Sequence, residues 1–372
     1  MTGNEAKIKV LLLFGGVSGE HPISCITASS VLHAIDQDKY EPLPVGITKD
    51  GQWTYLPADE YQADLGNGEL PEITEVGTPA RLDVTGGTQE LVVVQDGQDV
   101  SLGKIDVVFP LLHGPFGEDG TVQGLLEIAA LPYVGPGVLA SAVGMDKHYM
   151  KLAFKAVGLE VGPYVVLDNK KFSRDPEAGY DAAEALGYPL FVKPARAGSS
   201  LGITRVTDRE GLIAAVDEAR NHDLKVVIES AIAGREIECA VLEGHGNDPA
   251  RASYPGEIVV TGGQDEFYDF EAKYMDRAAS ELSCPADLSE EAIAEVRRQA
   301  VIAFDAVDAE GLSRVDFFYT PEGKFVINEI NTMPGFTPIS MYPQMWDKTG
   351  LPYPQLVDEL LTLALERPIG LR

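Results

Sequence analysis

The stretch that decides the fold is 311–341, GLSRVDFFYTPEGKFVINEINTMPGFTPISM. Its pattern predicts two short strands, RVDFFY and KFVINEIN, joined by a TPEG turn with Pro and Gly where a turn needs them. A Gly/Pro-rich loop follows the second strand. We therefore expect a β-hairpin near the end of the chain, and its polar side chains decide what it can do.

Three oxygen-bearing side chains interrupt this apolar hairpin. Asp316 stands beside Phe317 and Phe318, while Glu329 and Asn331 are two residues apart and leave the same face of the second strand. Such oxygens are costly among apolar neighbours unless a cation joins them. All-oxygen ligation suits a hard ion such as Mg²⁺, which completes its shell with water and substrate phosphate. The alternative is an ordinary hairpin with exposed acids.

Cationic side chains elsewhere in the chain complement these ligands. Lys147 lies in a predicted amphipathic helix, Lys193 near the end of a strand, Lys273 in a polar, aromatic-rich loop, and Arg314 in the hairpin itself. The loop ARAGSSLG after Lys193 offers backbone N–H groups that can fold over phosphates, although hairpin loops are often equally rich in Gly and Ser. This inventory indicates phosphoryl transfer, with cations on the phosphates and hard-metal ligands bridging them.

The N-terminal part predicts an open α/β sheet. IKVLLLF (8–14) is typical of a buried parallel strand, and a glycine turn leads into a helix over about 23–35. Ligands of such folds gather at the carboxyl ends of the strands. Glu20 lies where the first turn meets the helix, a place that also suits a simple helix-start charge. His113 ends the strand IDVVFPLL, where we favour a functional role, and 57–104 predicts a partly exposed insertion with one clear strand, LVVVQ.

Composition limits the classes of function. With 372 residues, the chain should form two or three domains of roughly 150 residues each. The net charge of −29 argues against a general nucleic-acid binder or a protein of anionic membranes. The N-terminal apolar run is too short for a membrane span or a secretory signal, and the 3 cysteines lack CxxC or zinc spacing. We therefore expect a cytoplasmic protein in a reducing compartment.

Motifs along nearly the whole chain resemble those of the ATP-grasp D-alanine–D-alanine ligases. In chain order they are GGVSGEHPIS (15–24), LHGPFGEDG (112–120), MDK (145–147), VKPARAGSSLG (192–202), REIECAV (235–241), FYDFEAKY (267–274), RVDFF (314–318) and NEINTMPGFTPISMYP (328–343). Two of them, HGPFGEDGT and NEINTMPGFTPIS, are not general ATP-grasp features. Segment 57–104 carries no recognisable motif of the family.

The resemblance implies an ATP-grasp fold of mixed α/β and α+β class. An N-terminal doubly wound α/β domain (1–137) would precede a small central ATP-grasp subdomain (138–228) and a C-terminal ATP-grasp subdomain with the metal site (229–372). The two α+β subdomains would hold ATP between them. The amino acids would lie between the first and third domains.

The resemblance also implies a reaction. ATP would phosphorylate the carboxylate of a first D-alanine, and the amine of a second would attack the acyl phosphate. The tetrahedral intermediate would then expel phosphate and leave D-alanyl-D-alanine for peptidoglycan precursors. The implied cofactors are ATP and two Mg²⁺ ions, for which Mn²⁺ can substitute. The implied partners are D-alanine, ATP and a second copy of the chain in a homodimer, with no nucleic acid and no membrane.

Contacts to ATP and metal carry over to matching positions. The expected ATP contacts are Lys147, Lys193, Ser200, Glu229, Ile232, Glu236 and Lys273. The first two lysines would hold the α- and β-phosphates, Lys273 would lie nearer the γ-phosphate, and the two glutamates would contact adenine and ribose. The expected metal ligands are the hairpin residues Asp316, Glu329 and Asn331, in agreement with the reading from the residues themselves.

Contacts to the amino acids carry over in the same way. The expected catalytic residues are Glu20, Ser199, Tyr274, Arg314 and Gly335, and the further substrate contacts are His113, Ser340 and Met341. Glu20 would pair with the first substrate's ammonium, and Arg314 with the backbone at Gly335 would face the oxyanion of the intermediate. Ser340 and Met341 would receive the second substrate's carboxylate. Ser199 and Tyr274 would link to Glu20 and order the loops when the site closes.

Two alternatives stay open. Ligases that form D-alanyl–D-lactate or use D-serine share the fold, but depsipeptide-forming relatives commonly lack a tyrosine at the position of Tyr274, so EAKY favours the amine-using enzyme. The chain departs from some members at Ser230, where they have a lysine, and at Phe270, where tyrosine is frequent. The other alternative is a nucleotide-binding regulator that binds ATP without turnover. The intact lysines and metal ligands disfavour it.

Overall fold

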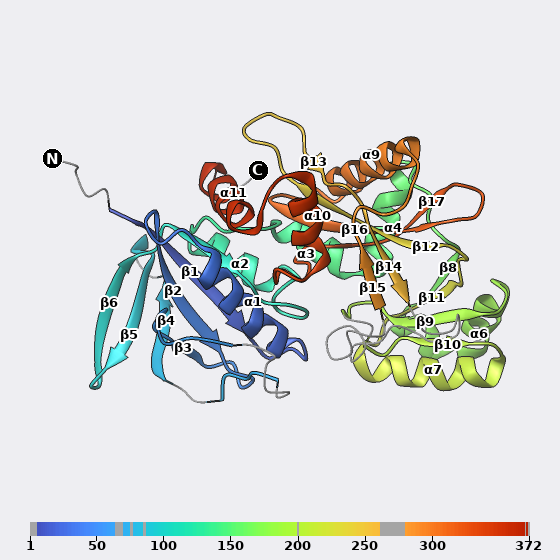
Figure 1. The fold of residues 1–372 in the computed structure, drawn as a ribbon. Helices are drawn as coiled ribbons and strands as arrows, with labels where there is room; N and C mark the ends of the chain where they lie inside the picture. Colours follow the sequence, from blue (N-terminus) through green and yellow to red (C-terminus); the bar gives the residue numbers. More distant parts are fainter. Residues whose placement is uncertain are drawn as a thin grey trace.

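The computed structural model describes residues 6–63, 70–74, 77–84, 87–198, 201–260, 280–368 and 370. Four of the predicted site residues lie outside these ranges: Ser199, Ser200, Lys273 and Tyr274. The described residues form three sheets, of seven, four and six strands, which follow one another along the molecule (Figure 1). Each sheet brings a different part of the predicted site.

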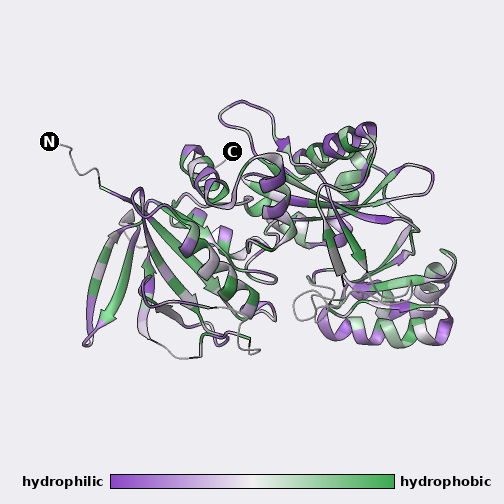
Figure 2. Ribbon diagram, in the orientation of Figure 1, coloured by the Kyte–Doolittle hydropathy of each residue, from purple (hydrophilic) through white to green (hydrophobic). Residues whose placement is uncertain are grey.

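The first sheet has a parallel centre. β1 (Ile8–Gly15) lies between β2 (Tyr40–Ile47) and β7 (Val107–Pro110) and pairs in parallel with both. Alternate residues of β1 pack against α1 (His21–Ala34) on one face and against α2 (Thr121–Ile128) on the other. Figure 2 shows the resulting apolar (green) run along β1. The predicted doubly wound arrangement is therefore confirmed, because helices cover both faces.

Segment 57–104 contains more β-structure than the sequence predicted. LVVVQ lies in β5 (Glu90–Gln95), as expected, but β4 (Thr78–Asp83) and β6 (Gln98–Lys104) pair with it in antiparallel fashion and β3 (Trp53–Tyr55) joins them to β2. β6 is an edge strand and mostly exposed, so it lacks the alternation of a half-buried strand. The strand at LVVVQ is confirmed, and β6 was not predicted for that reason.

The second sheet is small and antiparallel, with the order β10-β9-β11-β8. Its strands are β8 (Tyr164–Leu167), β9 (Leu190–Pro194), β10 (Thr204–Val206) and β11 (Val226–Ser230), and its helices are α5 (Asn169–Arg174), α6 (Pro176–Glu184) and α7 (Arg209–His222). It forms the separate lower-right body in Figure 1. The expected boundary at residue 228 falls inside β11, which continues to Ser230.

The third sheet contains the predicted hairpin. Its strands are β12 (Arg235–Leu242), β13 (Arg251–Ala252), β14 (Gly256–Val260), β15 (Ser280–Ser283), β16 (Leu312–Tyr319) and β17 (Phe325–Asn331). β16 pairs with β12 on one side and with β17 on the other. The long helix α9 (Glu290–Ala306) packs on this sheet and begins at Ser289, whose side chain accepts from the N–H of Ala292. The hairpin prediction is confirmed.

The helix expected around Lys147 is two helices. α3 (Val138–Met145) ends at Asp146, which has an extended backbone, and α4 (Lys147–Ala156) starts anew with the Asp146 carboxylate as its N-cap. One continuous helix was therefore wrong, because Asp146 satisfies the free N–H groups of a second helix start. Both helices pack against β17 of the third sheet, although the sequence places them in the central segment.

The C-terminal helices join the first and third sheets. α10 (Met341–Thr349) and α11 (Tyr353–Glu366) contribute buried residues such as Trp346 and Leu360 to a core that also contains Val31 of α1 and Phe109 of β7. Figure 1 shows α11 (red) beside the first sheet. The loop between β17 and α10 is therefore held next to the turns that end β1 and β7.

Candidate active site

Two turns of the first sheet meet at its carboxyl edge. Ser18 Oγ donates to the carbonyl oxygen of His113 (2.7 Å) and accepts from the backbone N–H of Glu20 (3.2 Å), so one hydroxyl joins both turns. The buried His113 Nδ1 lies 3.4 Å from Glu118 Oε1 and 3.2 Å from the carbonyl oxygen of Met333. Burial opposes protonation, but Glu118 outweighs it, and the pKa of His113 lies above its ordinary value. His113 thus ties the first sheet to the loop after β17.

Glu20 reaches a loop of the second sheet. A Cβ on Gly114 would lie 2.6 Å from Glu20 Oε2, and a Cβ on Gly198 would lie 3.0 Å from the same oxygen. The Glu20 carboxylate therefore lies close to the backbone of both glycines. Gly198 belongs to the small-residue loop after β9, so the structure brings Glu20 to the loop with which the sequence linked it.

A lysine cluster, defined as Lys151, Lys193 and Glu229, lies between the second and third sheets. Lys193 Nζ donates to Glu229 Oε2 (2.8 Å), and Lys151 Nζ lies 3.0 Å from Glu229 Oε1 and donates to the carbonyl oxygen of Asn328 (3.1 Å). All three charged side chains are buried. Burial raises the pKa of Glu229, but the two lysines lower it further, to about 2. Two cations that share one carboxylate leave positive charge for a phosphate.

The sequence reasoning missed Lys151. Burial lowers its pKa below the ordinary value, whereas Lys193 keeps a raised pKa because Glu229 outweighs burial. One signal was present: Lys151 follows Lys147 by four residues in α4, so both side chains lie on one helix face. That spacing identifies Lys151 only once the face of α4 that meets the site is known.

Lys147 connects the small-residue loop to the hairpin. Its backbone N–H donates to the carbonyl oxygen of Ala195 (3.0 Å), and its Nζ donates to that of Ala197 (2.8 Å). The same Nζ lies 3.7 Å from Glu329 Oε2. A cation between the small-residue loop and a predicted metal ligand is well placed to bind phosphate.

Two ion pairs that the sequence did not single out fix the base of this loop. Arg196 Nε and Nη2 donate to the Asp223 carboxylate at 2.9 and 2.7 Å. Lys225 Nζ donates to both carboxylate oxygens of Asp146 at 2.7 and 2.8 Å. The carbonyl oxygen of Lys225 accepts from the N–H of Ala195 (2.9 Å), so Lys225 links the base of the loop to Asp146, which also caps α4.

Carboxylates on three adjacent strands form what we call the carboxylate row: Glu238 of β12, Asp316 of β16 and Glu329 of β17. Glu238 pairs with Asp316 across one ladder and Asp316 with Glu329 across the next, so neighbouring Cβ atoms are about 5 Å apart. Arg314 Nε and Nη2 donate to both Asp316 oxygens, each at 2.7 Å, and Arg314 Nε lies 3.2 Å from Glu238 Oε2. Asn331 Nδ2 donates to Asp316 Oδ2 (2.9 Å).

The predicted metal ligands therefore come together and fit a hard cation. Two carboxylates and one amide supply oxygens, and Mg²⁺ is commonly held by one or two carboxylates together with substrate phosphates. Within the described part of the chain, no three His, Cys, Asp or Glu side chains gather in metal-binding geometry. A cation here would thus depend on Asn331 and on phosphate oxygens to complete its shell. Glu238 is not among the site residues predicted from the sequence.

The predicted carboxylate-binding residues lie at the start of α10. Ser340 Oγ accepts from the N–H of Thr337 (3.2 Å), and a Cβ on Gly335 would lie 3.1 Å from that oxygen. The Met341 side chain is buried against Gly256, so only its backbone can face a substrate. The N-terminus of a helix favours a carboxylate.

The other predicted ATP contacts lie on the connection between the second and third sheets. Glu229 is near the end of β11, and Ile232 follows in the turn, where a Cβ on Gly162 would lie 2.6 Å from its Cδ1. Glu236 is exposed in β12 and raises the pKa of Lys193. Ile232 and Glu236 thus follow Glu229 of the lysine cluster along one segment of the chain.

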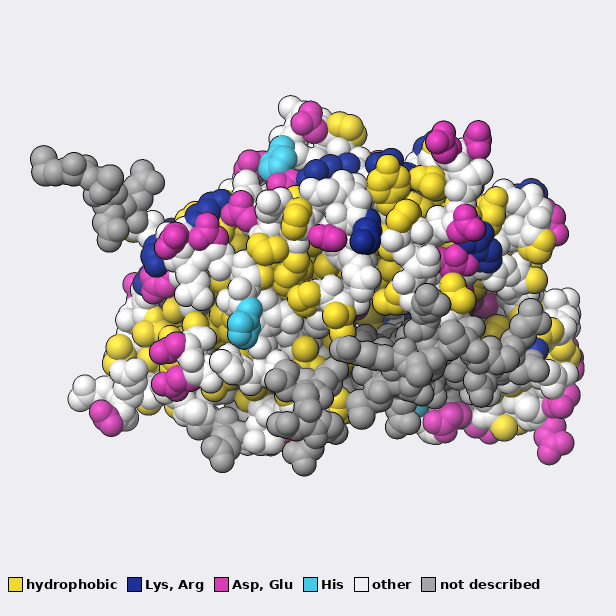
Figure 3. Space-filling view, in the orientation of Figure 1, with side chains coloured by type: hydrophobic (Ala, Val, Ile, Leu, Met, Phe, Trp, Pro, Cys, Tyr) yellow, Lys and Arg dark blue, Asp and Glu magenta, His cyan; other side chains and the backbone are white. Residues whose placement is uncertain are grey.

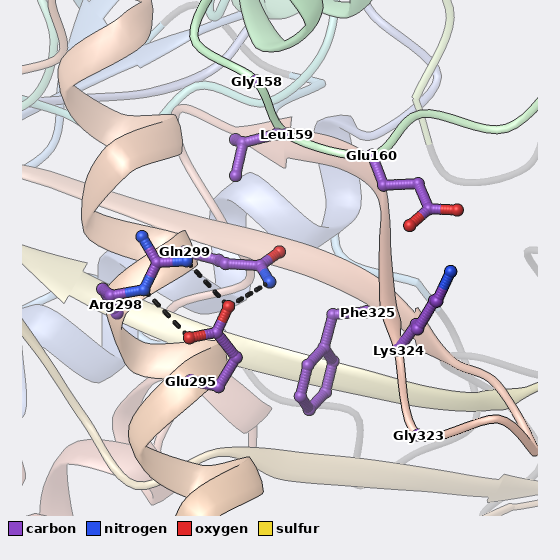
Figure 4. Close-up of a pocket in the computed structure, with 9 residues that line it drawn as sticks. All are labelled: Gly158, Leu159, Glu160, Glu295, Arg298, Gln299, Gly323, Lys324 and Phe325. Carbon is purple, nitrogen blue, oxygen red and sulfur yellow. Dashed lines mark hydrogen bonds and ion pairs between the residues drawn. The ribbon is translucent and has the colours of Figure 1, made fainter.

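A separate cavity of about 360 Å³ lies between α9 and the β16–β17 turn (Figure 4). Its Glu295 accepts from Arg298 and Gln299, and Phe325 covers one wall. It contains none of the predicted site residues. On the face shown in Figure 3, acidic and basic side chains are interspersed, and the described residues form no broad basic patch there.

Two family models match the chain, D-ala D-ala ligase N-terminus over residues 9–136 and D-ala D-ala ligase C-terminus over residues 153–362. The chain belongs to the D-alanine–D-alanine ligase family. A D-alanine–D-alanine ligase of Arthrobacter sp. (strain FB24) is 60% identical over 368 residues, 99% of this chain and 96% of the relative. One from Kineococcus radiotolerans is 54% identical and covers 99% of this chain and 100% of the relative.

Solved structures of this ligase family have the same fold. The D-alanine-D-alanine ligase from Coxiella burnetii matches with a TM-score of 0.81 and 35% identity over 97% of this chain and 94% of that chain. The VanG D-Ala:D-Ser ligase from Enterococcus faecalis matches with a TM-score of 0.82 and 35% identity over 96% and 100%. The predictions of an ATP-grasp fold and of a ligase are therefore confirmed, while the roles of single residues stay predictions. No helix in the described ranges is long and apolar enough to cross a membrane.

Proposed function

We propose that this chain joins two D-alanine molecules into D-alanyl-D-alanine and converts ATP to ADP and phosphate through a D-alanyl phosphate intermediate. The observation that supports this most directly is the meeting of all three sheets at one place. Glu20 of the first sheet reaches Gly198 of the second, and His113 of the first reaches Met333 beside the hairpin. A reaction between a nucleotide and two amino acids needs groups from separate surfaces to converge in this way.

On the nucleotide side, Lys147 and Lys193 would bind phosphate oxygens. Glu229 and Glu236 would accept hydrogen bonds from adenine and ribose. Glu229 holds Lys193 at 2.8 Å in this structure, so a bound triphosphate would share that lysine with it. Ser200, Ile232 and Lys273 complete the proposed contacts.

On the amino-acid side, Glu20 would pair with the ammonium of the first D-alanine, next to His113. Arg314 and the backbone at Gly335 would stabilise the oxyanion, a role that suits a fixed guanidinium. Ser340 and the backbone of Met341 would bind the second carboxylate at the helix start. The acyl phosphate formed from the first D-alanine would be attacked by the second amine near Arg314, so both amino acids would lie between the first and third sheets.

We propose two Mg²⁺ ions, for which Mn²⁺ can substitute, on Asp316, Glu329 and Asn331. When bound, they would neutralise charge on the β- and γ-phosphates. Asp316 would need to share its oxygens between this role and Arg314, which donates to both of them.

The experiment is a substrate screen with ATP and Mg²⁺ at neutral pH. Phosphate release and product mass are measured with D-alanine alone, with D-alanine plus D-lactate, and with D-alanine plus D-serine, and L-alanine serves as the control. We expect D-alanyl-D-alanine as the main product. A depsipeptide or a D-alanyl-D-serine product without the dipeptide would contradict the proposal.

The D-serine alternative needs this screen because likeness of fold does not decide it. The D-Ala:D-Ser ligase and the D-alanine-D-alanine ligase among the solved structures share 35% identity each with this chain. The 60% identity to the Arthrobacter relative favours two D-alanines. ATP binding without turnover would instead favour the regulator.

We further propose that the chain forms a homodimer in the cytoplasm. Each chain would consist of three domains, 1–137, 138–228 and 229–372. The dimer and the location rest on the family alone. Light scattering coupled to size exclusion measures the mass directly, and a particle of 40.0 kDa, the mass of one chain, would contradict the dimer.

A further inference from the structure

Arg314 has two carboxylate partners, and one of them has a second task. Its guanidinium donates to both oxygens of Asp316 at 2.7 Å, while Nε lies 3.2 Å from Glu238 Oε2. If the proposed function holds, Asp316 must offer these same oxygens to a divalent cation. The proposed function gives Glu238 no role of its own.

Register places Glu238 where it can serve Arg314 throughout the reaction. On β12, Glu238 is directly opposite Asp316, and the next residue on that face, Ala240, is opposite Arg314. The methyl group of Ala240 leaves the guanidinium room to lean toward Glu238. The exposed fraction of the side chain is 7% for Glu238 and 18% for Arg314, so both charges are largely removed from water.

If the ion pair between Arg314 and Asp316 breaks, the guanidinium needs another carboxylate as its partner. An uncompensated buried charge is strongly unfavourable, and Arg314 cannot escape by deprotonation. Glu238 is the second carboxylate already in contact with it. It therefore offers Arg314 a counter-charge that the metal does not need.

We propose that Glu238 is a positioning residue that keeps Arg314 paired when a divalent cation occupies Asp316. With the cation bound, the guanidinium moves its hydrogen bonds from Asp316 toward Glu238, which frees the Asp316 oxygens and holds Arg314 beside the acyl centre. Glu238 thus favours metal binding through Arg314 rather than by touching the metal. This inference rests on the proposed function, because it assumes the cation at Asp316.

The test is a double-mutant cycle on cation affinity. Mn²⁺ binding is measured by electron paramagnetic resonance and calorimetry in the presence of ADP for the wild type, Glu238→Gln, Arg314→Met and the double variant. We expect Glu238→Gln to weaken Mn²⁺ binding about tenfold in the wild-type background and less than about twofold in the Arg314→Met background. Arg314→Met alone should tighten binding because a competitor and a like charge are removed.

A kinetic measurement separates positioning from a merely structural role. Glu238→Gln should lower kcat about tenfold with little change in KM for ATP, and Glu238→Asp should restore part of kcat and of Mn²⁺ affinity. The matched control is Glu257→Gln. Glu257 lies on the neighbouring strand β14 and pairs with Arg235 of β12 at 2.6 Å, outside the site. That variant should leave both readouts unchanged.

Equal effects of Glu238→Gln in both backgrounds would overturn the inference, because Glu238 would then act on the cation directly. If Glu238→Gln does not fold, the cycle is run with Glu238→Asp. A separate variant, Glu329→Gln, tests the premise that a divalent cation binds at the proposed metal site. If it leaves Mn²⁺ affinity intact, the proposed metal site fails. If it weakens Mn²⁺ binding while Glu238→Gln does not, the inference about Glu238 fails and the proposed function stands.

Discussion

The lysine cluster and the carboxylate row have opposite charge balances, although ion pairs hold both regions together. In the lysine cluster, Lys151 and Lys193 share the single carboxylate of Glu229. In the carboxylate row, Arg314 contacts both Glu238 and Asp316, with Glu329 alongside. Both regions pair their buried charges, as buried charges require. Among the described residues, the lysine cluster has more cations than carboxylates, and the carboxylate row has more carboxylates than cations.

The difference in charge balance indicates what each region can bind. Spare cations suit phosphate oxygens, and spare carboxylates suit a divalent cation. Lys147 stands between the two, with its Nζ 3.7 Å from Glu329 Oε2 and hydrogen-bonded to the loop after β9. A complex of a divalent metal ion with a triphosphate has both a cation and anionic oxygens, so its charges match both regions.

Glu329→Gln should lower kcat by about 10³-fold, because a neutral amide cannot replace a metal-binding carboxylate. Steady-state rates and Mn²⁺ affinity measure this, and cooperative thermal unfolding should persist. The control is Glu322→Gln, an acid in the exposed turn of the same hairpin. Retained turnover in Glu329→Gln would remove it from the metal site.

Lys193→Met should raise KM for ATP and lower kcat/KM by about 100-fold, because a buried cation that meets phosphate is lost. Initial rates at varied ATP concentration provide the measurement. Mn²⁺ affinity without nucleotide should change much less, since the direct carboxylate contact of Lys193 is with Glu229 and not with the carboxylate row. A large loss of that affinity would mean that the two regions are not separate.

Lys151→Met should raise KM for ATP about tenfold with kcat nearly unchanged. Without Lys151, the remaining Glu229–Lys193 pair is balanced, and Glu229 holds Lys193 more tightly against the incoming phosphate. Calorimetry with a non-hydrolysable ATP analogue gives the affinity directly. Lys155→Met, four residues further along α4 at an exposed position, is the control. A fall in kcat without a change in affinity would contradict this role.

The free energy of unfolding should depend on pH through Glu229. Its pKa lies at about 2 in the folded chain against an ordinary value of 4.5, so its stabilising contribution is complete above pH 4.5 and disappears as the pH falls through about 2. Glu229→Gln should make this acid dependence shallower by up to about 1.4 kcal/mol per pH unit. Urea unfolding between pH 2 and 5 measures it, and an unchanged slope would place Glu229 outside the buried ion cluster.

The hairpin and the parallel centre of the first sheet were predicted because their signals are local, and the polar residues of the hairpin were singled out in the same way. Most other site residues were predicted from the resemblance to the ligase family. Asp316, Glu329 and Asn331 interrupt largely apolar strands, and β1 is apolar except for Lys9. The edge strand β6 and the break at Asp146 were missed because pairing and capping depend on neighbours that the local pattern does not reveal. Lys151 was missed because nothing in α4 states which face meets β11.

The motifs along the chain were enough to recognise the family and with it the fold, and periodicity and spacing indicated the residue types of the chemistry. Only the tertiary structure decided which charges share a partner. Lys151 and Glu229 are 78 positions apart, and Glu238 and Arg314 are 76 apart, yet each pair is in contact. Such contacts arise from strand register and from helix packing across sheets, and these fix the charge balance that distinguishes the phosphate side of the site from the metal side.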